Sequence, residues 1–358
     1  MTPRKRNHDD EHEHHGGCCG GRDEDCCDAA DSDESGCDDP GHSHEGCCGG
    51  HHDARDESGT PPGAQMRELE VLQRAIGRQL AEKQFDSAEE ANAFVSSLIA
   101  DKSAEEIFAG LDLTPEEESL LLVAQAIKAN NDEEALELLE RALELDPTNL
   151  DAQIALINAE SPEDEAAQLR KIVRDAESRL GEAFFASHRG DFYTDPVTRP
   201  YMRARQMLMT ALGQTGDIEG AIAEAEGLLD LCPNDNLGVR EFLAGYYLTS
   251  DRAEDALTLM DGRYPKDHSA VFEYARMLAN YKVGREDAAK ESLTNALERN
   301  PYVLPLLFGL MRPEEVADTS APGTPGEAMF VIGVLYDALV ANQPALEWAV
   351  SKWQEIME

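Results

Sequence analysis

Hydrophobic residues recur at spacings of three and four along most of the chain after residue 63. Met66, Leu69, Leu72, Ile76 and Leu80 form the first such series. This spacing places apolar side chains on one face of an α-helix. No strand-like alternation of useful length accompanies it. The pattern predicts an all-α fold, with N-terminal helices over residues 64–112.

A pattern of small residues and prolines repeats within residues 113–309. An Asn or Gly is followed after 5, 12 and 17 residues by Ala, by Ala or Leu, and by Pro. The three copies are Asn130, Ala135, Ala142 and Pro147; Gly216, Ala221, Leu228 and Pro233; and Gly284, Ala289, Ala296 and Pro301. A shortened copy has Asp251, Ala256 and Pro265. Small side chains let two antiparallel helices approach, Gly ends the first helix and Pro stops the second. The spacing of Pro233, Pro265 and Pro301 is close to the period of a helix–turn–helix solenoid.

The repeat predicts where the paired helices begin and end. The first helices are Tyr201–Gly213, Gly238–Thr249 and Val271–Tyr281, and their partners are Ile218–Leu231, Ala253–Asp261 and Glu286–Arg299. An irregular insertion is expected over residues 181–199 and a linker rich in Pro, Gly and Ser over residues 310–326. Two capping helices are expected in 327–358, covering Glu327–Ala341 and Ala345–Ile356. Their apolar residues can close the open end of the stack, as solenoids require; these are Leu335, Leu339, Leu346, Trp348, Val350 and Trp353.

The segment from Asp132 to Pro147 resembles the second half of a tetratricopeptide repeat, and the unit that ends at Pro301 is similar. Ser119, Arg205 and Glu273 stand where that repeat usually has a large aromatic residue. The resemblance implies a helical-hairpin solenoid that binds proteins.

A second resemblance covers residues 66–356. It rests on Gly181–Phe185, Thr198–Arg205 and Cys232–Asn236, which are similar to a bacterial repeat family related to the suppressor-of-tumorigenicity repeat proteins. This resemblance implies a helical array with no assigned catalytic activity.

Residues 1–63 have a different composition. They contain 11 Gly and almost no aliphatic side chains, so they cannot bury enough apolar surface to offset the entropy of ordering. We expect a disordered, acidic, Cys/His-rich tail. A block of His, Gly and Cys occurs in it twice. Candidate metal ligands are His12, His14, His15, Cys18, Cys19, Cys26, Cys27, Cys37, His42, His44, Cys47, Cys48, His51 and His52.

Thiolates and imidazoles suit zinc, nickel or copper. The tail has no Cys-x-x-Cys pair, so the pattern favours a chelating tail over a zinc finger. The alternative is a solubilising tail whose metal affinity is incidental.

The charge balance limits the classes of partner that we expect this chain to bind. The chain has a formal net charge of −41, and residues 64–358 carry 55 Asp and Glu against 26 Lys and Arg. This field repels nucleic acids and anionic membranes, so we expect neither as a partner. Seven of the eight Cys lie before residue 53, unlike a disulfide framework, and no signal peptide or spanning segment is apparent. We therefore expect a cytoplasmic protein.

No catalytic motif is present. The sequence lacks the zinc-protease helix motif, the phosphate-binding loop, the dinucleotide-binding turn and the nucleophile elbow. His188 and Cys232 have no evident catalytic partner, and Cys232 is interpreted as an inert, partly buried thiol. The chain is predicted not to be an enzyme and to require no cofactor.

The leading functional hypothesis is a scaffold that holds an unidentified peptide or protein segment in the concave groove of the repeats. The repeat register assigns Arg203, Gln206, Glu241, Tyr274, Tyr281 and Lys282 to this groove. An arginine there could grip a carboxylate with two hydrogen bonds. In the competing interpretation, the arginines of the 199–205 cluster neutralise acidic residues within the fold. The second functional hypothesis is a metal-handling protein whose tail chelates, stores or delivers zinc, nickel or copper while the repeats dock clients.

Overall fold

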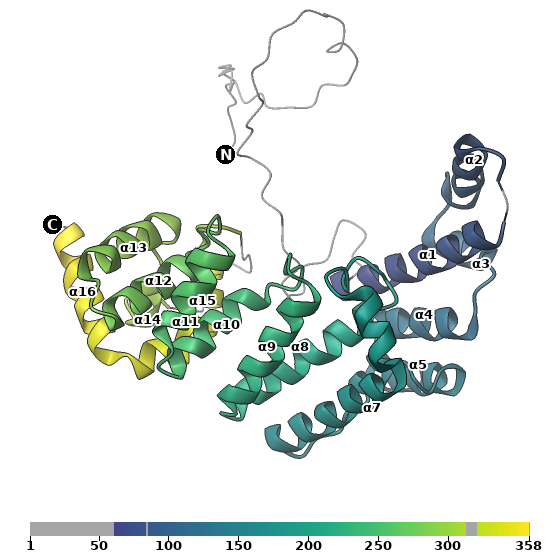
Figure 1. The fold of residues 1–358 in the computed structure, drawn as a ribbon. Coiled ribbons are helices and arrows are strands. Elements are labelled where there is room, and N and C mark those ends of the chain that lie inside the picture. The colour runs from purple at the N-terminus through teal and green to yellow at the C-terminus, as the bar shows by residue number, and fades with distance from the viewer. Residues whose placement is uncertain (1–60, 84, 313–320, 358) are drawn as a thin grey trace, which may run out of the picture. The chain divides into compact units, whose positions relative to one another are not determined.

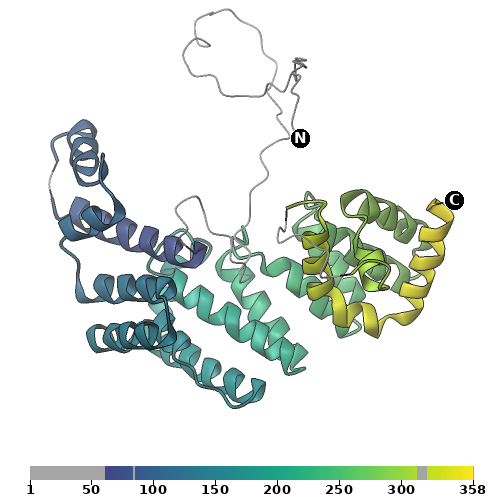
Figure 2. The ribbon, with the colours of Figure 1, turned by 180° about the vertical axis from the view of Figure 1, so that it is seen from behind.

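The computed structural model describes residues 61–83, 85–312 and 321–357, and within these ranges the chain is helical and contains no strand. The predicted all-α, helical-repeat-like fold is confirmed, and Figures 1 and 2 show the helices from two sides. The α-helices are α1 (Pro62–Glu82), α2 (Ala88–Ile99), α3 (Ala104–Gly110), α4 (Pro115–Lys128), α5 (Asp132–Leu145), α6 (Leu150–Ala155), α7 (Pro162–His188), α8 (Arg199–Gln214), α9 (Ile218–Leu231), α10 (Val239–Thr249), α11 (Ala253–Leu257), α12 (Ala270–Lys282), α13 (Glu286–Arg299), α14 (Val303–Leu307), α15 (Pro325–Ala341) and α16 (Gln343–Met357). A π-helical turn, η1 (Thr258–Arg263), continues α11.

Consecutive helices pack in pairs, as the repeat predicts. α4 packs on α5, α8 on α9, α10 on α11, and α12 on α13 (Figure 1). Of the alanines five residues into each copy, Ala221, Ala256 and Ala289 are fully buried, whereas Ala135 is only partly buried. In that first hairpin the fully buried alanine is Ala142, seven residues further on. A larger side chain at these points would push the paired helices apart, so the sequence pattern follows directly from the packing.

The turns between paired helices use the left-handed backbone conformation. Gly216 and Gly284 have φ angles of 79° and 76°, and Asp251 of the shortened copy has 63°. Asn130 is the exception, since Asn131 instead caps α5 through its side chain in an extended conformation. The turn between α4 and α5 therefore joins its two helices with a different backbone conformation from that of the other turns.

Polar contacts stand where the tetratricopeptide pattern would have aromatic packing. The hydroxyl of Ser119 on α4 donates to the carbonyl oxygen of Ala142 on α5. Arg205 on α8 pairs with Glu224 on α9 at 2.6 Å. Glu273 on α12 accepts a hydrogen bond from an α13 side chain. In these three hairpins a polar side chain thus bonds one helix to its partner.

The predicted irregular insertion over residues 181–199 is partly wrong. The backbone breaks at Gly181, where φ is 73°, but helix resumes and α7 extends to His188. The rings of Phe185 and Phe192 stack at a centroid distance of 5.3 Å, and Tyr201 of α8 meets Phe185 edge to face. This aromatic packing anchors the second segment of α7, so only residues 189–198 are irregular.

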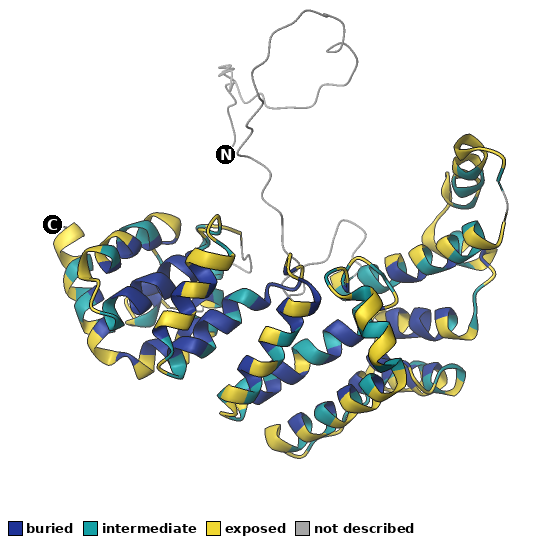
Figure 3. Ribbon diagram, viewed as in Figure 1, coloured by how far each residue is buried: buried dark blue, intermediate teal, exposed yellow. Residues whose placement is uncertain are grey.

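The predicted C-terminal helices are confirmed, with a different placement for the first one. α16 packs on α12 and α13 of the last hairpin, as an end cap should. α15 instead lies along α10, α12 and α14 (Figures 1 and 2). It therefore covers α10 and α12, the first helices of two successive hairpins. Figure 3 shows the buried residues of this part of the chain in dark blue.

No single helix in the described ranges is both long enough and apolar enough to span a membrane. Only α15 and α16 together have the required length and composition, and they are bent by 115° at the break between them.

Replacing Ala221 with Leu should lower the free energy of unfolding by about 1–3 kcal/mol, because the added volume overpacks the α8–α9 contact. Chemical denaturation followed by circular dichroism measures this loss. Ala223→Leu is the matched control, since Ala223 lies on the same helix and is exposed. Equal stability of the two variants would contradict the packing argument.

Candidate functional site

The residues assigned to a peptide groove lie in contacts within the fold. Tyr274 is fully buried, and its hydroxyl donates to the carbonyl oxygen of Asn300. Tyr281 packs on Trp348 of α16 at 5.2 Å between ring centroids, and Lys282 pairs with Asp251 at 2.7 Å. The prediction that Tyr274 lines an open groove is wrong, because the hairpins and the C-terminal helices enclose it.

α15 occupies the surface on which such a groove would lie. The ring of Phe330 on α15 meets Phe242 on α10 edge to face, at 6.2 Å. A Cβ placed on Gly245 would come within 2.7 Å of the carbonyl oxygen of Val334, so α10 accepts the α15 backbone directly. Only glycine permits this approach. The site of the predicted ligand is filled by the chain itself.

The opposite face of α15 is apolar and exposed. Met329, Tyr336 and Val340 are 39%, 53% and 53% exposed, and nothing lies within 4 Å of a Cβ placed on Gly333. Together these four residues form the α15 seam. Their spacing of four, three and four residues matches the contact positions of helices that pack side by side. A second helix can therefore lie along α15.

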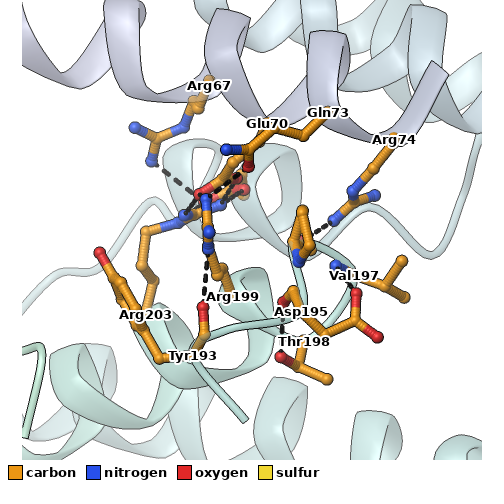
Figure 4. A network of polar contacts seen from close by, with 12 residues as sticks. Arg67, Glu70, Gln73, Arg74, Tyr193, Asp195, Val197, Thr198, Arg199 and Arg203 are labelled. Atoms are coloured by element: carbon orange, nitrogen blue, oxygen red, sulfur yellow. Dashed lines mark hydrogen bonds and ion pairs between the residues drawn. The ribbon is translucent and has the colours of Figure 1, made fainter. Parts of the chain in front are cut away.

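The remaining predicted cation, Arg203, lies in a buried network of ion pairs (Figure 4). Its guanidinium donates to Asp151 at 2.6 and 2.8 Å and to Glu70 at 2.6 and 2.9 Å. Arg67 donates to the same Asp151 carboxylate at 3.0 Å. The competing interpretation, in which the arginines neutralise acids of the fold, is confirmed for Arg203.

This network joins α1 to α6 and α8. Burial alone would raise the pKa of the Asp151 carboxyl, but the charges and hydrogen bonds of Arg203 and Arg67 outweigh it and lower the pKa. Burial acts against the charge of Arg203, but Asp151 and Glu70 raise its pKa overall. The Asp151 carboxylate and the Arg203 guanidinium therefore stay charged, and each stabilises the charge of the other.

Two more arginines border the network. Arg199 donates to the carbonyl oxygen of Tyr193 and to Gln73, and Arg74 donates to the carbonyl oxygen of Pro196 at 2.6 Å (Figure 4). These bonds tie the irregular segment 189–198 to α1. Sequence spacing gives no sign of this contact, because the partners are more than 100 residues apart.

The other predicted groove residues also have internal partners. The amide of Gln206 donates to the carbonyl oxygen of Leu237 at 3.2 Å. Glu241 is buried at the start of α10, where burial raises its pKa to about 7. The negative charges of Asp267 and Asp235 add to this effect, while Ser269 and Arg240 oppose it. Glu241 is thus a buried carboxyl group of the fold and does not line an open binding surface.

The isolated candidates for chemistry have structural surroundings. The thiol of Cys232 is buried and donates to Asn236. His188 contacts Phe184 and lies 3.5 Å from Asp195. The fourteen candidate metal ligands of the tail lie outside the described residues, and the described part of the chain has no cluster of three or more potential ligands.

Comparison with known proteins gives one partial match. The model of the family described as transcriptional repressor TCF25 matches residues 199–323. The match covers α8 to α14, the hairpins on which α15 packs, and the chain is similar to that family over this region. The matching family is neither of the two that the sequence motifs resemble. A search of curated proteins finds no match.

Replacing Arg203 with Met should destabilise the protein by about 3–5 kcal/mol, because the buried carboxyl groups of Glu70 and Asp151 would lose their main partner. Denaturant titration measures the loss, and limited proteolysis should cut earlier in α1. Arg174→Met is the control, since Arg174 is an exposed arginine. A loss below 1 kcal/mol would show that the network contributes little.

Replacing Glu241 with Gln should remove a pH dependence of stability. A carboxyl whose pKa is raised by folding stabilises the fold while it is protonated and loses that contribution as pH rises through its folded pKa. Between pH 5 and pH 8 the native chain should lose about 2–3 kcal/mol relative to Glu241→Gln. Thermal unfolding of both proteins across this range tests the difference. Parallel stability curves would contradict it.

Proposed function

We propose that the chain is a non-enzymatic regulatory scaffold that binds an amphipathic helix of a partner protein along the α15 seam. The seam supports this proposal because it is an exposed apolar stripe with helical contact spacing on a helix already fixed by its other face. The concave groove is not proposed as the site, since α15 packs over α10 and α12, and Arg203 on α8 is engaged by Glu70 and Asp151.

The fixed position of α15 matters for binding. Ala328, Val331, Leu335, Ala338 and Leu339 of α15 are at most 1% exposed. Their burial holds the helix in place before any partner arrives, so binding does not have to order it. Tyr336 offers a large, partly exposed ring, a residue type that often dominates binding energy. Gly333 lets the partner helix approach closely.

Charge indicates the partner's character. Asp337 is exposed beside Tyr336, and residues 64–358 carry a large excess of acidic residues. Basic residues flanking an apolar helix face would be attracted to this surface, and a second copy of this chain would be repelled. We therefore expect a helix with basic flanks, contributed by another protein.

The TCF25 match supports a regulatory role. The name of that family concerns transcriptional repression, and its matching region provides the hairpins under α15. With a net charge of −41, contact with proteins is a better route to such a role than contact with nucleic acid.

The Gly333→Leu variant should lose partner binding while it stays folded. The added side chain meets open space in the free protein but blocks the approach of a second helix. The probe is a fluorescein-labelled helical peptide with leucines at intervals of four and three and lysine flanks, measured by fluorescence anisotropy. We expect at least about tenfold weaker binding, a loss of about 1.4 kcal/mol.

Gly77→Leu is the matched control, because Gly77 is also an exposed helical glycine with open space around it. The same peptide with glutamate flanks should bind more weakly than the lysine form. Unchanged binding to Gly333→Leu, or a preference for the glutamate peptide, would rule out the seam as the site.

A further inference from the structure

The helix α6 is unusually short for its place in the array. It has 6 residues, whereas α4, α8 and α12 have 14, 16 and 13. α6 ends before Leu156, and α7 begins only six residues further on, with Ser161 as its cap and Pro162 in its first turn. α6 therefore cannot cover the lengths of α5 and α7 between which it lies.

The uncovered space is a pocket of about 290 Å³. α5, α6 and α7 line it with apolar side chains, which are Leu143, Leu150, Leu156, Ile172 and Ala176. Its polar lining consists of Gln153, Lys171, Asp175 and Arg179. The volume is at the lower limit of small-ligand pockets, about 300–1,000 Å³, which suits one large side chain better than a cofactor.

The charge at this pocket differs from that of the rest of the chain. Lys171 pairs with Asp175 at 3.3 Å, and both side chains are largely exposed. Arg179 is exposed and has neither an ion pair nor a hydrogen bond from its side chain to any described residue. One cation therefore remains available beside an apolar pocket, in a part of the chain where acids outnumber bases two to one.

We propose that this pocket binds a short acidic segment of a partner protein, with one large apolar side chain in the pocket and a neighbouring carboxylate on Arg179. The apolar lining supplies the free energy of burial. Arg179 supplies selection, since a guanidinium forms paired hydrogen bonds with a carboxylate. The surrounding acidic surface repels acidic segments. We therefore expect an acidic segment to bind at this pocket and not elsewhere on the chain.

The test uses the full chain and a fluorescein-labelled peptide with one Phe flanked on both sides by Asp and Glu. Fluorescence anisotropy measures its binding. Arg179→Glu should weaken binding about five- to tenfold, because it replaces the attraction of an exposed charge pair with a repulsion. Arg174→Glu is the matched control, since it makes the same charge change at an exposed site on α7 outside the pocket.

A second variant tests the pocket itself. Gln153→Trp places a ring in the pocket from a partly exposed position and should also abolish binding. A peptide with Ser in place of Phe should bind at least about tenfold more weakly. Equal losses in Arg179→Glu and Arg174→Glu, equal binding of the Ser peptide, or no binding to the native chain at about 1 mM would each overturn the proposal. The α15 seam is unaffected by these variants, so its proposal stands or falls separately.

Discussion

The close approach of paired helices at small side chains is the constraint on which the rest of the fold depends. Ala142, Ala221, Ala256 and Ala289 are each fully buried where a hairpin closes. The turns must then be tight, which explains the positive φ of Gly216 and its equivalents. With the backbones this close, a polar side chain on one helix can reach the other. The hairpins therefore tolerate Ser119, Arg205 and Glu273 in place of aromatic residues.

A second constraint follows from the first. Hairpins stacked in this way leave the apolar faces of their first helices uncovered, and a repeat protein must cover them or offer them to a ligand. Here α15 covers α10 and α12, with Gly245 accepting its backbone. The outer face of α15 is left exposed, and it is the surface on which we propose that a partner helix binds.

Local signals in the sequence predicted the helices well, because they depend on residues close together in the chain. The bounds of α9 and α13 are those expected from the repeat, and the arginine cluster neutralises acids as one interpretation held. Contacts between distant segments left no such signal. The pairing of Arg203 with Glu70 spans 133 residues, and the contact of α15 with Gly245 spans about 90. Periodicity assigns a helix its buried face but does not identify the helix that buries it. The repeat register therefore assigns Tyr274 to an exposed groove, although its side chain is fully buried and bonds to Asn300 of the same hairpin.

Electrostatics separates the two proposed sites. The most strongly paired arginines, such as Arg203, form ion pairs with carboxylates inside the fold. Acidic side chains therefore remain in excess on the surface. An apolar surface within that field, such as the α15 seam, favours a partner with basic flanks. The pocket beside α6 instead favours an acidic segment. Arg179 has no ion-pair partner among the described residues, and its positive charge lies within an acidic surface. Two sites with opposite preferences compete little for the same segment. The two proposals together describe a chain that holds two different segments at once, which is what distinguishes a scaffold from a single-ligand binding module.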